Sequence, residues 1–464
     1  MKKVVHADGA DSTRTSATRA SSAFATLLPG EDRTPSGGAE SGSPCAERAA
    51  PLSGASSRGS FPANGETFRI PRRAVSEPGT DDLPLRGLRV VDFTRVLAGP
   101  LCTMLLGDMG AEVLKIEDPR HGDDTRAWEP FVDGWSTYFL SVNRNKKSVA
   151  VDLKSTDGSA LVRELIRGAD VLVENFRPGT LERLGFGPDA ARALNERLIY
   201  CSISGYGTSG PRSDLAGYDM VIQGESGLMD VTGFPETGPT KVGVAITDCL
   251  AALYAVQGIL LAHITRARTG KGQVVDIALL DAAVSVLGLP AGIVAATGKS
   301  PGRLGNEHPS LAPYEPYPAT DGQVIVAVAN PRLWSRFCAA VGAVALEHDP
   351  RFATNGDRLQ NRSALNREIR ALFASQTVDA LIEKLTAAGV PCGRVRTIEQ
   401  VLEDPQLVAR QMLTAIGLGK ETVKVPGNPV KLSGVRAIAS APPPALGQHT
   451  EETRAAAHRR ESEK

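Results

Sequence analysis

The sequence is poor in the residue patterns that build disulfide frameworks and metal centres. Its six cysteines are spread over 464 residues, and none stands in a Cys-x-x-Cys pair. This usage indicates reduced thiols and no disulfide framework. The seven histidines contain no His-x-x-x-His pair, so we expect no protein-bound zinc site.

Long apolar runs and an excess of one charge sign are also missing. Lys+Arg and Asp+Glu both number 52, which favours neither nucleic acid nor an anionic membrane as a partner. No apolar run reaches the ~18 residues that span a bilayer, and the interrupted run 250–264 predicts a buried helix instead. With 42% hydrophobic residues, the chain can build a substantial core and about two domains.

Residues 1–84 differ in composition from the rest of the chain. They are dominated by Ser, Ala, Gly, Thr, Pro and Arg. Such a segment buries too little apolar surface to offset its conformational entropy, so we predict a disordered low-complexity extension. A transit peptide is the alternative, although Asp8 and Asp11 argue against it. We therefore expect a cytoplasmic protein, or a mitochondrial matrix protein if the extension is a targeting signal.

From Leu85 onward, apolar strands alternate with helices. Helices are predicted at 101–109 and 157–167, and strands at 89–93, 112–116, 148–152, 171–175 and 198–204. This alternation predicts an α/β fold with a mostly parallel sheet. Ligands bind beyond the carboxyl ends of such strands. The loops after Phe93, Ile116, Asp152 and Asn175 are therefore the expected site.

The second half of the chain predicts a smaller α/β domain. A long helix at 247–265 and a strand at 273–278 complete the large domain, which we place at 85–299. Residues 300–322 are rich in Gly and Pro and are predicted to be a loop. A strand at 323–329 and helices at 331–341, 366–374 and 378–388 follow. We therefore assign a small domain to 300–395, a return to the large domain to 396–450, and a polar tail to 451–464.

Several stretches carry side chains suited to chemistry, and each has an ordinary structural explanation as well. Asn175 to Gly179, with Arg183, offers an amide, an aromatic face and cations at a strand end, or simply a strand-to-helix turn. Asp248 opens the long helix and is either a helix cap or a nucleophile. The loop Gly305 to Pro309 either covers a ligand or links two domains.

Taken together, these segments resemble the family III CoA-transferases, the formyl-CoA and carnitine CoA-transferase group. The resemblance covers about residues 85–450. It is carried by LRVVDFTRVLAGP, GDMGAEVLKIE, NRNKKSVAVDLK, VLVENFRPGTLERLG, LIYCSISGYGTSGP, AGYDMVIQGESGLMDVTG, VGVAITD, TGKGQVVDIALLDA and GNEHPSLAPYE. RVLAGP, GDDTR, YFLSVNRNKKS and LGQHT are most similar to the succinyl-CoA:glutarate CoA-transferase branch.

The resemblance implies a fold and a mechanism. The fold is a Rossmann-like large domain plus a smaller α/β domain in an interlocked homodimer. Asp248, which ends VGVAITD, would be the nucleophile, and the helix start would keep its carboxylate ionised. Coenzyme A would pass between acids through aspartyl anhydride and aspartyl-CoA thioester intermediates. No permanently bound cofactor is implied, because CoA enters as an acyl-CoA substrate.

The same resemblance implies the residues that bind coenzyme A. They are Leu97, Ala98, Val151, Asp152, Leu153, Lys154, Asn175, Phe176, Arg177, Arg183, Ala216, Gly217 and Tyr218. Two positions depart from the formyl-CoA transferase pattern. Asp118 replaces an arginine, so Arg120 is expected to hold a phosphate in its place. Leu97 replaces a polar residue of the oxalate-handling members, which argues against oxalate as the acceptor.

The acceptor acid is not fixed by these residues. Arg95 and His308, with Gly305 and Asn306 beside the latter, are candidate ligands for a distal carboxylate, which favours a dicarboxylate such as glutarate and succinyl-CoA as the donor. The chain after LGQHT lacks the usual final helix, so dimer stability or site closure could suffer.

Two other functions remain open. An α-methylacyl-CoA racemase is one, but Tyr218 stands where racemases carry histidine, and tyrosine is a poor base at neutral pH. A CoA-binding protein that has lost its activity is the other.

Overall fold

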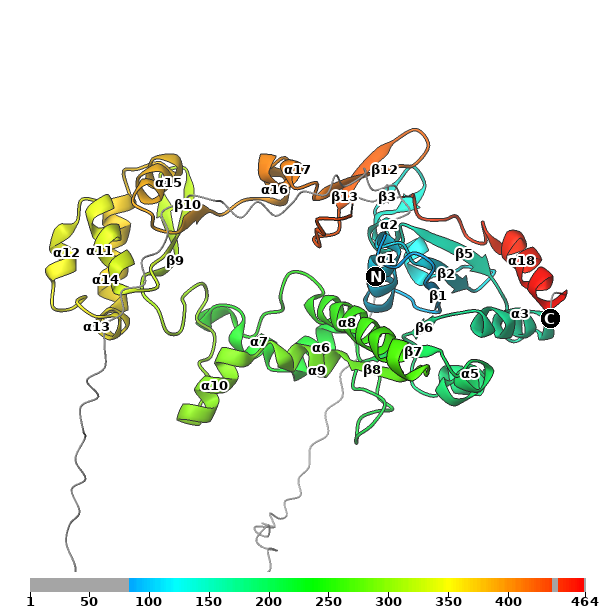
Figure 1. The fold of residues 1–464 in the computed structure, drawn as a ribbon. Helices are drawn as coiled ribbons and strands as arrows, with labels where there is room; N and C mark the ends of the chain where they lie inside the picture. Colours follow the sequence, from blue (N-terminus) through cyan, green and yellow to red (C-terminus); the bar gives the residue numbers. More distant parts are fainter. Residues whose placement is uncertain (1–82, 436–440, 463–464) are drawn as a thin grey trace, which may run out of the picture. The chain divides into compact units, whose positions relative to one another are not determined.

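The structure is a computed structural model that describes residues 83–435 and 441–462. The predicted disorder and the alternative transit peptide of residues 1–84 lie almost entirely outside the described residues. The chain forms a large α/β unit, a smaller α/β unit and a returning C-terminal segment (Figure 1). The division at residues 299, 395 and 450 stays a prediction.

A six-stranded parallel sheet forms the centre of the large unit. Its strands are β1 Arg89–Asp92, β2 Glu112–Glu117, β5 Lys146–Ala150, β6 Val171–Glu174, β7 Ile199–Ser204 and β8 Val274–Ala278, in the order β5-β2-β1-β6-β7-β8. Every neighbouring pair is parallel, which confirms the predicted Rossmann-like α/β class. The chain builds outward from β1 to β5 and then returns to place β6 beside β1. The strand order therefore reverses between β1 and β6, where ligands of such sheets bind.

Both faces of the sheet are covered by helices, as a parallel sheet requires. Val90 and Val91 of β1 are 0% and 1% exposed but join different cores, because successive strand residues point to opposite faces. One face packs against α1 Ala98–Asp108, α8 Ile246–Thr269 and α9 Leu279–Ser285. The other packs against α3 Thr156–Arg167 and α5 Pro188–Leu194.

Short elements connect these layers. They are η2 Asp124–Ala127, β3 Phe131–Val132, β4 Trp135–Ser136, α2 Thr137–Val142, α4 Thr180–Arg183, α6 Asp219–Glu225, α7 Leu228–Val231, η3 Pro235–Thr237 and α10 Gly288–Thr297. Helix α1 begins three residues before its predicted start at Leu101, because Pro100 is accommodated in its first turn. The five cysteines of the described ranges are all free thiols.

Helix α8 is buried on one face only, so the prediction of a buried helix is half correct. Ala251, Ala255 and Ile259 are fully buried, whereas Leu253 and Leu261 are 53% and 57% exposed. By length and composition alone, α8 is apolar enough to cross a membrane, and the bent pair α9 and α10 passes the same test together. Here α8 lies along β7 and β8 (Figure 1) and contributes to the core of the large unit.

The smaller unit contains an antiparallel sheet and five helices. The strands are β9 Tyr314–Ala319, β10 Gly322–Ala327 and β11 Cys392–Arg394, in the order β11-β10-β9. The helices are α11 Pro331–Ala340, α12 Val344–His348, α13 Asn355–Gln360, α14 Arg362–Phe373 and α15 Val378–Ala387. The predicted loop 300–322 is wrong where β9 lies. Pro316 and Pro318 suggested irregular structure, but β9 is an edge strand, where proline is tolerated.

The returning segment forms two short helices and a hairpin. Helices α16 Ile398–Leu402 and α17 Pro405–Ala409 are followed by strands β12 Leu413–Gly417 and β13 Thr422–Pro426. Ile416 and Val425 of the hairpin pack against Leu140 of α2.

The expectation of no final helix is wrong, because α18 spans Thr450–Ser462 and lies beside α3 (Figure 1). Three hydrogen bonds tie its start to the edge strand β5. His449 N donates to Ser148 O at 2.9 Å, Ser148 N to His449 Nδ1 at 3.2 Å, and Ala150 N to Thr450 Oγ1 at 2.9 Å. The segment has a polar composition because only Thr453 and Ala457 are buried among residues 450–459, the part of the helix whose burial the structure describes.

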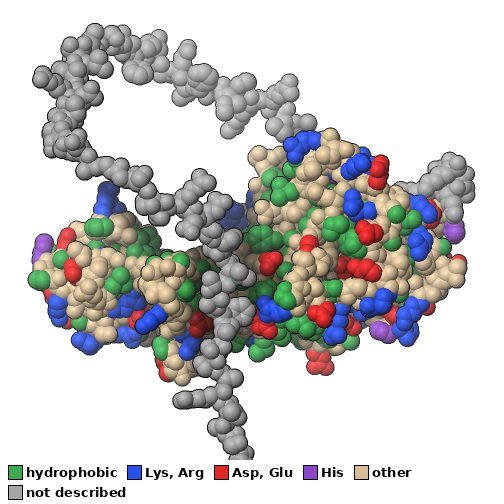
Figure 2. Space-filling model, turned by 90° about the horizontal axis from the view of Figure 1, so that it is seen from below, with side chains coloured by type: hydrophobic (Ala, Val, Ile, Leu, Met, Phe, Trp, Pro, Cys, Tyr) green, Lys and Arg blue, Asp and Glu red, His purple; other side chains and the backbone are tan. Residues whose placement is uncertain are grey.

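Charged side chains of both signs are interspersed over the face in Figure 2, and hydrophobic side chains lie among them. This distribution agrees with the balanced composition of 52 basic and 52 acidic residues.

Candidate active site

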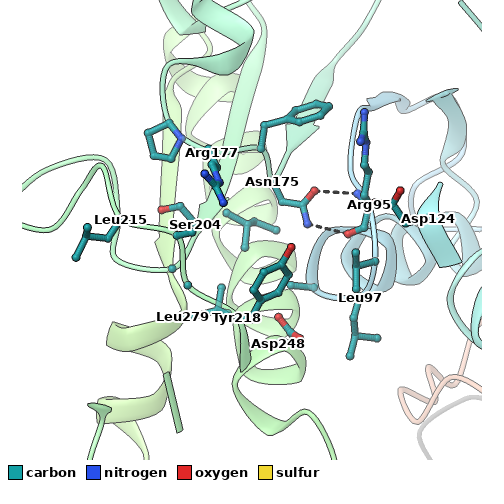
Figure 3. A pocket seen from close by; sticks show the side chains of 18 residues that line it. Arg95, Leu97, Asp124, Asn175, Arg177, Ser204, Leu215, Tyr218, Asp248 and Leu279 are labelled. Atoms are coloured by element: carbon teal, nitrogen blue, oxygen red, sulfur yellow. Dashed lines mark hydrogen bonds between the residues drawn. The ribbon is translucent and has the colours of Figure 1, made fainter. Parts of the chain in front are cut away.

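A cavity of 290 Å³ opens where the sheet order reverses. Segments that follow β1, β6 and β7 line it together with α8 (Figure 3). The structure brings together these residues of the predicted site: Arg95, Leu97, Ala98, Asn175, Phe176, Arg177, Ala216, Gly217, Tyr218 and Asp248. They come from four separate parts of the sequence, which meet because the carboxyl ends of parallel strands share one edge of the sheet.

Asp248 lies in the first turn of α8, but it is not the helix cap. The cap position is Ala245, which has no side chain able to bond the helix N–H groups. Asp219, at the start of α6, performs this function from another element. Its Oδ1 accepts hydrogen bonds from Thr247 N at 2.9 Å and from Thr247 Oγ1 at 2.8 Å. The simple explanation of Asp248 as a cap is therefore wrong.

The Asp248 carboxyl group has no hydrogen-bond partner among the described residues. In Figure 3 it lies below Tyr218 and beside Leu97. Burial and, to a smaller extent, the neighbouring charge of Asp219 together raise the pKa of Asp248 to about 7. The helix start thus does not keep the pKa of this carboxyl group low, because desolvation outweighs the helix dipole, although part of the carboxylate stays ionised near neutral pH.

The loop after β1 faces Asp248 across the cavity and is clamped to the loop after β6. Arg95 N donates to Asn175 Oδ1 and Asn175 Nδ2 donates to Arg95 O, both at 2.8 Å (dashed in Figure 3). The Arg95 guanidinium lies 4.8 Å from the centre of the Phe176 ring. Leu97 occupies the cap position of α1 and provides no side-chain cap, so the backbone N–H of Ala98, which lines the cavity, has no side-chain acceptor.

A second cavity of 710 Å³ adjoins the first, because Arg95, Asp124 and Phe176 line both. It contains the predicted residues Arg120, Val151, Asp152, Leu153 and Lys154. Arg120 donates to both carboxylate oxygens of Asp118, at 3.2 and 3.0 Å, and its side chain is 77% exposed.

Some predicted residues line neither cavity. Arg183 bonds Thr180 Oγ1 at 3.1 Å, and Thr180 itself lines the larger cavity. Gly305 instead packs on Phe234, and Gly305 N donates to Gly233 O at 2.9 Å. His308 contacts Tyr314, with 5.0 Å between the ring centres. The structure of this chain does not bring Gly305, Asn306 or His308 to Asp248 in either cavity.

Sequence reasoning missed several residues of the site. Ser204 ends β7 and Gly205 follows it, so the rule that ligands bind beyond the carboxyl ends of parallel strands would have found them had it been applied to this strand. Burial and the nearby charge of Asp248 together raise the pKa of Tyr138 to about 12. No local pattern indicates that Tyr138 of α2 lies near α8.

Comparison with known proteins gives consistent matches over this region. The family model for CoA-transferase family III matches residues 85–450. The succinate–glutarate CoA-transferase of Agrobacterium fabrum is 41% identical and covers 79% of this chain and 94% of its own. The acetyl-CoA:oxalate CoA-transferase of Acetobacter aceti is 41% identical, over 76% of this chain and 90% of its own. A CAIB/BAIF family protein from Brucella suis has a similar solved structure, with TM-score 0.73, 41% identity, and coverage of 81% and 99%.

Proposed function

Because this chain belongs to CoA-transferase family III, we propose that it moves coenzyme A from succinyl-CoA to a dicarboxylate such as glutarate, with Asp248 as the covalent carrier. One observation carries the assignment of Asp248. It is the cavity-lining carboxylate that is partly buried and unpaired, whereas Asp124, the other carboxylate in that lining, is exposed. Asp219 is committed to capping α8.

The reaction begins when an Asp248 oxygen attacks the thioester carbonyl of the donor. The C–S bond breaks, which leaves an aspartyl–acyl anhydride and CoA thiolate. The thiolate attacks the aspartyl carbonyl, frees the donor acid and leaves an aspartyl-CoA thioester. The acceptor carboxylate attacks this thioester, which gives a second anhydride and CoA thiolate. The thiolate then takes up the new acyl group, and Asp248 is regenerated.

Two features of the cavity support this chemistry. The uncapped start of α1 supplies the backbone N–H of Ala98 opposite Asp248, and such a donor stabilises the oxyanion of a tetrahedral intermediate. Partial burial also strengthens each of these interactions, because water screens them less. The pKa of about 7 for Asp248 still leaves much of the carboxylate ionised near neutral pH.

We place coenzyme A along the two adjoining cavities, which share Arg95, Asp124 and Phe176. The thiol end belongs in the 290 Å³ cavity beside Asp248, and the nucleotide end in the 710 Å³ cavity beside Lys154 and Arg120. Arg120 is partly neutralised by Asp118, so Lys154 is the main candidate for a phosphate contact in this proposal.

Cations beside the cavity favour an acceptor with a second carboxylate. Arg95 and Arg177 both line it, and each can hold a distal carboxylate with a two-pronged hydrogen bond. Leu97 adds an apolar wall suited to the methylenes of a longer diacid. The relatives differ on the acceptor, since one name states glutarate and the other oxalate.

We also propose the homodimer. Exposed apolar side chains lie along one connected stretch of the large unit, from α8 through α10, and include Leu253, Leu261, Ile264, Val284, Leu289 and Val294. A second copy of the chain would cover such a surface. Gly305, Asn306 and His308 stay predicted substrate contacts, and a cytoplasmic location stays a prediction.

The test is a panel of acids incubated with succinyl-CoA, with each new acyl-CoA separated and identified. We expect glutaryl-CoA from glutarate and little oxalyl-CoA from oxalate. Activity with monocarboxylates alone would contradict the dicarboxylate proposal. Deuterium exchange into a 2-methylacyl-CoA without any acyl transfer would instead support the racemase alternative.

A further inference from the structure

Two lysines lie completely inside the large unit, beneath the loop that faces Asp248. The side chains of Lys115 on β2 and Lys146 on β5 are both 0% exposed. Lysine is rarely buried to this extent unless it is paired. Neither lysine lines the cavity near Asp248, so direct contact with the substrate does not explain them.

Lys115 connects the loop to a second buried charge. Its Nζ donates to Thr94 O at 2.8 Å and to Asp123 Oδ2 at 2.9 Å. The other oxygen of Asp123 accepts from Val96 N at 3.3 Å and from Thr125 N at 3.0 Å. Asp123 is only 1% exposed. The Lys115–Asp123 pair therefore holds the loop backbone on both sides of Arg95.

The held segment has an unfavourable backbone conformation. Val96 has φ +67°, a left-handed conformation that is a genuine outlier for a β-branched residue. Such a conformation persists only where surrounding contacts impose it. Here the contacts are the Asp123 bond to Val96 and the Asn175 clamp on Arg95. The consequence is the sharp turn that aims Leu97 and the first turn of α1 at the cavity.

Lys146 completes the support from the side of α1. Its Nζ donates to Asp92 Oδ2 at 3.1 Å, to Pro100 O at 2.9 Å and to Asn143 Oδ1 at 3.0 Å. Asp92 Oδ1 in turn accepts from Thr94 N at 2.8 Å and from Thr94 Oγ1 at 2.5 Å. The loop is thus fixed at both of its ends.

Stability alone is a poor reason to keep such a pair. Removing two charges from water costs several kcal/mol per ion, and apolar residues of similar volume often stabilise a protein as well or better. Apolar residues in place of Lys115 and Asp123 could not form directed hydrogen bonds with Thr94 O and Val96 N. The contribution of the charged pair is therefore the geometry of the loop.

We propose that Lys115 and Asp123 are positioning residues of the transferase, which hold the loop Thr94–Leu97 in the strained conformation that builds the wall opposite Asp248. The proposal rests on Asp248 carrying the acyl group, as proposed above.

The decisive variant is Lys115→Met, compared with Arg266→Met, which removes a buried cation from an ion pair with the partly exposed Asp170. Arg266 bonds Asp170 at 2.9 Å and is 5% exposed, but it lies about 27 Å along α8 from Asp248 at 1.5 Å per residue. We expect Lys115→Met to lower kcat about 100-fold, as a misplacement of about 1 Å can do, with KM for the acyl-CoA nearly unchanged. Arg266→Met should lower the melting temperature and leave kcat near the wild-type value.

A double variant separates positioning from folding. Lys115→Met with Asp123→Asn leaves no unpaired buried charge and keeps an acceptor for Val96 N. We expect it to recover thermal stability but not kcat, because Thr94 O still lacks its donor. Recovery of kcat together with stability would overturn the proposal, and so would a folded Lys115→Met enzyme with wild-type kcat.

A variant without any charge change keeps the proposal testable if Lys115→Met does not fold. A Cβ at Gly99 would lie 2.3 Å from Thr94 Cβ, so Gly99→Ala must shift the same loop. A lower kcat with unchanged KM is expected, and an unchanged kcat would count against the role of the loop. Transfer by the wild-type enzyme without an Asp248 adduct in mass spectra would contradict the proposed nucleophile, while the kcat comparisons would still decide the role of the pair.

Discussion

The polar groups at the amino-terminal ends of the strands in the six-stranded sheet are used in the opposite way from those at the carboxyl-terminal ends. We call these two ends of the sheet its amino-terminal and carboxyl-terminal edges. At the amino-terminal edge, Asp170 accepts from Arg89 N and from Arg266, both at 2.9 Å. Glu112 accepts from Arg89 at 3.1 Å and from Lys147 at 3.0 Å. At the carboxyl-terminal edge, Asp248 stands unpaired in a cavity. One edge satisfies its own charges, and the other leaves groups available to a ligand.

The difference follows from chain topology. At the amino-terminal edge the strands receive short connections, and their charges find partners on neighbouring strands. At the carboxyl-terminal edge the connections diverge where β1 and β6 lie side by side, and a crevice forms. Buried ion pairs hold the loop after β1 in place at this edge. Polar groups around the crevice can therefore remain without a hydrogen-bond partner. Substitutions at the two edges should therefore have opposite effects on activity and stability.

The largest effect is expected for Asp248→Asn. Removal of the nucleophile should lower transfer at least about 1000-fold, within the range seen when a covalent catalytic group is lost. The measurement is acyl-CoA formation, with the adduct sought by mass spectrometry. A residual rate within tenfold of wild type would exclude the covalent role.

The same variant should gain stability, and the size of the gain should depend on pH. The pKa of Asp248 rises from 3.8 to about 7 on folding, so the folded state binds this proton more tightly than the unfolded state. Ionised Asp248 therefore destabilises the fold progressively as pH rises from about 4 to 7. The free energy of unfolding of Asp248→Asn, measured by thermal denaturation, should exceed that of the wild type by about 1 kcal/mol at pH 8. No gain is expected at pH 4. Equal gains at both pH values would contradict this explanation.

The sequence was sufficient to predict the sheet, and the reason is local. Val90, Val91 and Val171–Val173 form short apolar runs that are typical of buried parallel strands. The rule that ligands bind beyond the carboxyl ends of parallel strands then located the site. Asp248 itself was not accessible to this reasoning, because Asp219 and Asp281 were equally eligible by local pattern, and only the family resemblance selected it.

What the sequence could not reveal depends on long-range contacts. Asp219 caps a helix that begins 27 residues later in the chain, and no local signal reports such a bond. The left-handed Val96 contradicts its own propensity and is imposed by Asp123. Helix α18 was missed because its apolar face is narrow and its anchor is the distant strand β5.

A smaller effect at the same edge is expected for Lys154→Met. This exposed side chain lines the larger cavity. Loss of one charged contact with a phosphate should weaken acyl-CoA binding by about 1.5 kcal/mol, or about tenfold in KM. The kcat should remain, because Lys154 is absent from the cavity around Asp248. Binding of CoA by calorimetry is the check, and an unchanged affinity would remove Lys154 from the site.

Asp219→Asn should change the pH profile more than the maximal rate. Asn keeps an oxygen that can accept from Thr247, but it removes the charge that raises the pKa of Asp248. The acid limb of kcat/KM should move to lower pH, so that activity at pH 6 rises a few-fold relative to the plateau. Profiles of both enzymes from pH 5 to 9 provide the measurement. A shift to higher pH would show that the cap, and not the charge, dominates.

The smallest effect on activity is expected for Arg89→Met at the amino-terminal edge. The change removes a pair with Glu112 and a bond to Gly168 O at 3.2 Å, while the backbone bond from Arg89 N to Asp170 remains. Unfolding free energy should fall by about 1 kcal/mol, and kcat should stay within about twofold, because the side chain lines a different cavity from Asp248. Denaturant unfolding and steady-state kinetics on one preparation decide the matter. A large fall in kcat at unchanged stability would mean that the two edges are coupled through β1, and the contrast between them would have to be abandoned.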